Sequence, residues 1–89
     1  MIVKVKKKQN NSTDCIICGV KNPNGVNAAF YSMEDGSCVS LFRFQGSHQS
    51  YPSRTHGGMV TAILDETIGR AVWAEDESLW GVTMKINVE

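Results

Sequence analysis

The residues best suited to carry out chemistry are one carboxylate and the small residues around it, within residues 55–73. At about 100° per residue, one side of a helix formed here carries only small residues and one acid. These residues are Gly58, Ala62, Asp65 and Gly69. Aspartate is unfavourable inside a helix, and glycine is about 1 kcal/mol less favourable there than alanine. The strip therefore indicates either a site that a ligand approaches closely, with Asp65 as its reactive group, or tight helix packing with Asp65 in solvent.

Another side of the same segment has apolar residues at the three-and-four spacing of an amphipathic helix. They are Val60, Ile63, Leu64, Thr67, Ile68, Ala71 and Val72. We predict a helix over about residues 57–75 that packs this face against a sheet. Glu66 and Arg70, four residues apart, are predicted only to support the helix.

Short apolar runs on both sides of the helix predict the strands of that sheet. Residues 26–33 and 38–44 flank an Asp-Gly pair, so we expect an antiparallel hairpin. Residues 79–88 alternate apolar and polar and predict a further strand, and residues 45–55 a loop. The composition of residues 1–14, at the start of the chain, predicts a basic and polar arm that is mobile or forms a short edge strand. The expected core or interface residues of the hairpin are Phe30, Val39, Leu41, Phe42 and Phe44.

The sequence His56-Gly57-Gly58, six further residues, Asp65 and then Gly69 resembles the helix-start signature of hotdog-fold acyl-CoA thioesterases of the 4-hydroxybenzoyl-CoA and phenylacetyl-CoA thioesterase type. Residues 15–19, 22–25 and 48–52 support this resemblance, which spans about residues 15–89. It implies an α+β hotdog fold, in which an antiparallel sheet wraps around one long central helix. The last strands of a complete hotdog sheet are missing. We therefore expect a partial domain, either a fragment or a shortened form whose exposed strand another chain covers.

The resemblance also implies roles for individual residues. Gly57 matches the oxyanion donor and Asp65 the catalytic carboxylate. His56 either orients the loop near the substrate carbonyl or caps the helix. Where the family often has asparagine or glutamine, this chain has Ser50, with Gln49 beside it. These two residues, together with Gly58 and Thr83, are the expected substrate-binding residues.

Hydrolysis of a thioester requires an activated water or a nucleophile, and stabilisation of the charge on the carbonyl oxygen. The unpaired N–H groups at a helix start provide the stabilisation. Asp65 would act as general base or as nucleophile, and we predict no cofactor and no catalytic metal. Asp65 lies eight residues beyond Gly57, about 12 Å along one helix. We therefore predict that Gly57 of one subunit works with Asp65 of another, in a homodimer or a dimer of dimers.

Length and charge limit the other possibilities. The chain has 89 residues, enough for one domain with a modest core, so oligomerisation is expected. Lys plus Arg and Asp plus Glu are nine each, which gives no support for a nucleic-acid or anionic-membrane partner. No apolar run approaches 18 residues and no secretion signal is present, so we expect a cytoplasmic protein.

Cys15 and Cys18 form a Cys-x-x-Cys-Gly knuckle, whose two thiolates suit a tetrahedral zinc ion. Only Cys38, His48 and His56 remain as further ligands, and a thioredoxin-like context of strand and helix is absent. The two thiols are otherwise part of a tight turn. Three interpretations stay open: an acyl-CoA thioesterase acting on a small or medium acyl or aryl group, which we favour, a non-catalytic acyl-CoA-binding or structural module, and a zinc-knuckle interaction module.

Overall fold

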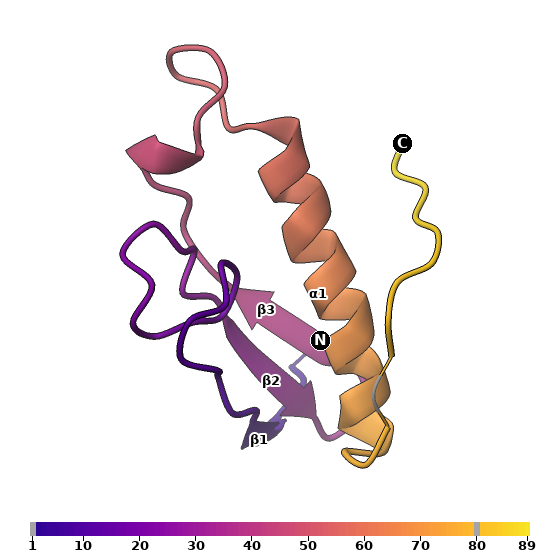
Figure 1. Ribbon diagram of the computed structural model, residues 1–89. Coiled ribbons are helices and arrows are strands. Elements are labelled where there is room, and N and C mark those ends of the chain that lie inside the picture. The colour runs from indigo at the N-terminus through magenta and orange to yellow at the C-terminus, as the bar shows by residue number, and fades with distance from the viewer. Residues whose placement is uncertain (1, 80) are drawn as a thin grey trace.

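The computed structural model describes residues 2–79 and 81–89. The described residues form β1 (Val5–Lys8), β2 (Ala29–Met33), β3 (Cys38–Leu41), the short 3₁₀ helix η1 (Gly46–His48) and the long helix α1 (Gly57–Glu75). The strands make one antiparallel sheet in the order β1-β2-β3, and α1 packs against β2 and β3 (Figure 1). The predicted α+β class with an antiparallel sheet is thus confirmed.

The hairpin of β2 and β3 turns at the Asp-Gly pair, as the sequence predicts. Tyr31 pairs with Val39 in its ladder. Gly36 has φ +89°, in the left-handed region that glycine adopts without steric strain. The Asp35 carboxylate accepts a hydrogen bond of 2.9 Å from the Ser37 N–H, which fixes the turn.

Strand β1 lies at the edge of the sheet, antiparallel to β2. Val5 is opposite Met33, and an irregularity between Val5 and Lys7 shifts the register. The pairing extends past the strand, because the Gln9 N–H donates to the Phe30 carbonyl over 2.8 Å. Of the two alternatives for the start of the chain, the structure has the edge strand.

Helix α1 spans the range over which the apolar periodicity predicts a helix, with a side-chain cap at its start and a backbone cap at its end. His56 is the N-cap, since its Nδ1 accepts a 2.8 Å hydrogen bond from the Gly58 N–H. At the other end the Asp76 N–H donates to the Val72 carbonyl, and the Asp76 carboxylate accepts from the Ser78 N–H. In the described part of the chain, no helix combines the length and apolar character needed to cross a membrane.

The core lies between the sheet, the Cys15–Gly19 turn and one flank of α1. Its buried members are Ile17, Cys18, Val26, Ala28, Phe30 and Ile63. Most of the predicted apolar face of α1 is not in it. The exposed side chains Val60, Leu64, Ile68 and Val72 are 38% to 63% accessible, and Val39 and Leu41 of β3 and Phe42 after it are also exposed. This part of the prediction is wrong for the single chain, because three short strands cover only the flank that carries Ile63.

The prediction of a strand over residues 79–88 is also wrong. Neither Leu79 nor residues 81–89 form a strand, and Trp80, which the predicted strand also includes, lies outside the described residues. The segment runs beside α1 on the side away from the sheet (Figure 1). Alternation alone does not make a strand, since its backbone groups need a neighbouring edge to pair with, and none of the strands β1, β2 and β3 pairs with residues 81–89.

Replacing Gly19 by alanine is expected to lower the free energy of unfolding by about 1–3 kcal/mol, the usual effect of overpacking. A Cβ at this position would lie 2.4 Å from the Cys15 carbonyl oxygen and 2.5 Å from the Cys15 nitrogen. These are backbone atoms, which cannot move aside cheaply. Urea denaturation of G19A beside G46A measures the effect, because a Cβ at Gly46 meets nothing within 4 Å. Equal midpoints for the two variants would contradict this account of the turn.

Candidate functional site

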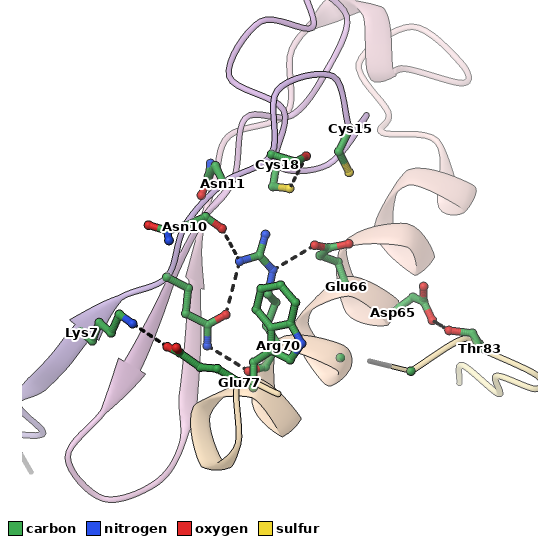
Figure 2. Close-up of a pocket in the computed structure, with 15 residues that line it drawn as sticks. Lys7, Asn10, Asn11, Cys15, Cys18, Asp65, Glu66, Arg70, Glu77 and Thr83 are labelled. Atoms are coloured by element: carbon green, nitrogen blue, oxygen red, sulfur yellow. Dashed lines mark hydrogen bonds and ion pairs between the residues drawn. The ribbon is translucent and has the colours of Figure 1, made fainter. Parts of the chain in front are cut away.

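A pocket of about 580 Å³ lies where the start of the chain, one side of α1 and the C-terminal segment meet. Its walls come from three parts of the chain: residues 7–18 on one side, α1 on another, and Glu77, Gly81 and Thr83 on the third (Figure 2). The lining residues from α1 are Asp65, Glu66, Gly69, Arg70 and Trp73. The pocket therefore includes two of the four residues of the strip, Asp65 and Gly69.

Asp65 lies midway along α1 at one end of this pocket. The Thr83 hydroxyl donates a hydrogen bond to its carboxylate (Figure 2). Thr83 is not on a strand, yet the C-terminal segment still brings it to the predicted carboxylate. One carboxylate oxygen is thus oriented by a neighbour, and the partly exposed side chain still borders the pocket.

Arg70 occupies the centre of the pocket wall and is only 5% exposed. Its guanidinium lies 4.6 Å above the Phe30 ring and 5.1 Å from the Trp73 ring, a cation–π arrangement. Its Nε pairs with the Glu66 carboxylate at 3.0 Å, and its Nη1 donates to the Asn10 carbonyl at 2.8 Å. Arg70 therefore joins the sheet, the arm after β1 and the helix.

The prediction that Glu66 and Arg70 only support the helix is wrong. Gln9 completes their network: its side-chain oxygen accepts from Arg70 Nη1, and its side-chain nitrogen donates to the Arg70 carbonyl and the Ser32 hydroxyl. Gln9 and Ser32 are themselves buried. A periodicity argument treats an i,i+4 charge pair as exposed, and no local pattern revealed a buried glutamine 61 positions away.

A second, smaller pocket of about 360 Å³ lies at the start of α1. Its lining includes the predicted residues Gln49, His56 and Gly58. The His56 ring occupies the Gly58 N–H as a helix cap, so the capping alternative for His56 is the one that the structure shows. Gly57 and Ser50 line neither pocket.

The predicted site residues therefore fall into two groups within one chain. Asp65 and Thr83 border the larger pocket, whereas Gln49, His56 and Gly58 border the smaller. Gly57 is the first residue of α1 and is exposed, with no hydrogen bond from its N–H to any described residue. A single chain does not bring its N–H group and the Asp65 carboxylate to one point.

His48 holds together the loops that support the smaller pocket, a role that sequence reasoning missed. The ring is 3% exposed and packs edge-on against Phe44. Its Nδ1 accepts from the Gln45 N–H at 3.0 Å, so Nε2 carries the proton and donates to the Asn24 carbonyl at 2.7 Å. Histidine in a polar loop gave no signal that its ring is buried.

Cys15 and Cys18 border the larger pocket on the wall opposite α1. Burial raises the pKa of the Cys18 thiol, but hydrogen bonds from Ser12 and Cys15 outweigh this and lower the pKa below its usual value. No group of three or more His, Cys, Asp or Glu side chains able to hold a metal ion occurs among the described residues. Among the described residues, Cys15 and Cys18 therefore have no further side chain that would complete a metal site with them.

No protein-family model, curated protein or solved structure matched this chain.

Proposed function

We propose that the protein is a hotdog-type acyl-CoA thioesterase whose active site is shared between two copies of the chain. The observation that carries the proposal is the position of Asp65, whose carboxylate borders a pocket of about 580 Å³ and accepts a hydrogen bond from Thr83. The antiparallel sheet packed on one long helix is compatible with part of a hotdog domain. A carboxylate oriented beside such a space can activate water or attack a thioester carbonyl.

The charge that develops on the carbonyl oxygen would be stabilised at the start of α1. Backbone N–H groups at this end point away from the helix and carry its partial positive charge. Because the Gly58 N–H is bonded to the His56 ring, the Gly57 N–H is the donor that remains for substrate. The surroundings of this N–H are open to a substrate, since even a Cβ at Gly57 would meet nothing within 4 Å.

Two observations support a shared site. Gly57 and Asp65 are separated by eight residues of one helix, about 12 Å, and Asp65 lines the larger pocket whereas Gly57 does not. The apolar side chains Val60, Leu64, Ile68 and Val72 also form an exposed row on α1. Two antiparallel helices that cross near Thr61 would set Gly57 of one chain level with Asp65 of the other, with Val60 and Leu64 of this row at the contact.

A non-catalytic acyl-CoA-binding module is the second candidate, and the His56 cap favours it. With the Gly58 N–H occupied, the helix start supplies one oxyanion donor from the backbone. Tight binding of acyl-CoA without release of free thiol would support this candidate.

The test of the proposed function is hydrolysis of a panel of acyl-CoA and aryl-CoA thioesters by the purified protein. Release of free coenzyme A is followed with a thiol reagent, and light scattering gives the oligomeric state of the same sample. Turnover by a dimer or tetramer is expected. A folded protein that neither hydrolyses nor binds any member of the panel would contradict both candidates.

Mixing two inactive variants is expected to restore about a quarter of the wild-type activity if the site is shared in a dimer. Asp65→Asn removes the carboxylate. Gly57→Pro removes the N–H, while proline suits the first helical position and His56 already has the extended backbone that precedes proline. With random exchange, half of the dimers are mixed, and each mixed dimer has one intact site.

The matched control is Gly57→Ala, which keeps the N–H and has room for its methyl group. It is expected to retain activity, whereas Gly57→Pro loses about 10²–10³-fold, the usual loss for one oxyanion donor. If mixing restores nothing although native mass spectrometry shows mixed dimers, each site lies within one chain.

A further inference from the structure

The Cys15–Gly19 turn places two free thiols at one wall of the larger pocket (Figure 2). The Gly19 N–H donates to the Cys15 carbonyl at 2.8 Å, which closes a single helical turn. In helical geometry, Cα atoms three residues apart lie about 5 Å from each other. A disulfide requires a Cα separation of about 4.4–6.8 Å, so this backbone can accept a bridge between Cys15 and Cys18 with little movement.

The two thiols differ in access. Cys15 is partly exposed, and the Ile17 N–H donates to its sulfur over 3.4 Å. Cys18 is 2% exposed, and its sulfur lies 3.3 Å from the Ser12 hydroxyl. Hydrogen bonds from Ser12 and Cys15 lower its pKa against the opposing effects of burial and of the Glu66 charge. One thiol is thus accessible to a reagent, and the other is held beside it in a setting that favours the reactive thiolate.

We propose that Cys15 and Cys18 form a dithiol site that exchanges with low-molecular-weight disulfides of the glutathione type. The Cys15 thiolate attacks one sulfur of the small disulfide, forms a mixed disulfide and releases the first small thiol. The Cys18 thiolate then attacks the Cys15 sulfur, closes the Cys15–Cys18 bridge and releases the second small thiol. Two protein thiols are oxidised and one small disulfide is reduced to two thiols, so atoms and electrons balance.

Cys38 provides an internal comparison. It is partly exposed like Cys15, but burial raises the pKa of its thiol, with the Arg70 charge acting in the opposite direction. It is also absent from the lining of the larger pocket. Cys38 is therefore expected to stay reduced under conditions that oxidise the pair. The proposal does not depend on thioesterase activity, and its test needs no acyl-CoA.

The test exposes the folded protein to glutathione disulfide, quenches with acid and maps the products by mass spectrometry. Trypsin releases residues 9–21 as one peptide with both cysteines, separate from the peptide that contains Cys38. The wild-type peptide is expected to lose two hydrogens. Cys18→Ser is expected to accumulate a glutathione adduct on Cys15, because the resolving thiolate is gone, and Cys15→Ser is expected to leave Cys18 unmodified.

Ser12→Ala tests whether the hydrogen bond between Ser12 and Cys18 promotes the exchange, or whether the closeness of the two thiols is sufficient. It is expected to raise the pKa of Cys18, measured by the pH dependence of the ultraviolet absorbance of the thiolate in a Cys15→Ser, Cys38→Ser background. It is also expected to lengthen the lifetime of the mixed disulfide on Cys15 when both cysteines are present. Circular dichroism verifies that each variant is folded. Three results would overturn the proposal. One is a stable adduct on Cys15 of the wild-type protein without bridge formation, and another is oxidation of Cys38 as fast as Cys15. The third is bound zinc that survives dialysis and protects both thiols. An inert wild-type pair would overturn it as well.

Discussion

Replacing Asp65 by asparagine is expected to reduce acyl-CoA hydrolysis by about 10²–10⁴-fold, the usual contribution of a general base. The amide has nearly the shape of the carboxylate, and its oxygen still accepts the hydrogen bond that Thr83 donates. It carries no negative charge and neither deprotonates water nor attacks a thioester at neutral pH. The variant should therefore bind substrate and keep the fold while losing kcat. Steady-state kinetics of free thiol release, beside an unfolding curve, measures both effects.

Asp76→Asn is the matched control for this change. Asp76 is an exposed carboxylate at the end of α1, and its oxygen accepts from the Ser78 N–H, a role that an amide oxygen also fills. It does not line the larger pocket. Asp76→Asn is expected to keep full turnover. Undiminished kcat in Asp65→Asn would exclude Asp65 as base and as nucleophile.

Replacing Arg70 by alanine is expected to lower the free energy of unfolding by about 3–5 kcal/mol, the usual effect of removing one partner from a buried ion pair. The change removes the stacking on Phe30 and leaves the Gln9 side-chain oxygen without its guanidinium donor. It also leaves the half-buried Glu66 carboxylate without its partner. A loss of this size is a large part of the stability of a small domain. Urea denaturation followed by circular dichroism gives the value.

Arg54→Ala provides the reference, because Arg54 is exposed and its guanidinium bonds only to the adjacent Ser53 carbonyl among the described residues. Its effect is expected within about 0.5 kcal/mol. Arg70→Lys should fall between the two, since lysine keeps the charge but not the planar fork of donors. If Arg70→Ala and Arg54→Ala unfold at the same urea concentration, the network contributes nothing to stability.

Local patterns predicted the elements whose causes are local. The apolar periodicity places a helix over residues 57–75, and the Asp-Gly pair predicts the hairpin turn at Gly36. The carboxylate strip on α1 likewise identified Asp65, which does border a pocket. In each case, a few neighbouring residues carry the structural cause.

Features that depend on distant partners were not predictable in this way. Residues 79–88 alternate like a strand, but residues 81–89 lie beside α1, where no described strand edge is available to pair with them. Arg70 has the spacing of an exposed pair, and its burial follows from Gln9 and Phe30, which approach it only in the folded chain. The division of the candidate site residues between two pockets likewise depends on distances that exist only in the folded chain.

The link between Gln9 and Arg70 also limits when the start of the chain can become stable during synthesis on the ribosome. The nitrogen and oxygen of the Gln9 side chain both bond to Arg70, 61 positions later. At about 5–20 residues per second, that interval takes roughly 3–12 s to synthesise. Strand β1 emerges first but lacks this anchor until most of α1 has left the exit tunnel. The nascent N-terminal segment is consequently open to chaperones and proteases for longer than the hairpin that follows it.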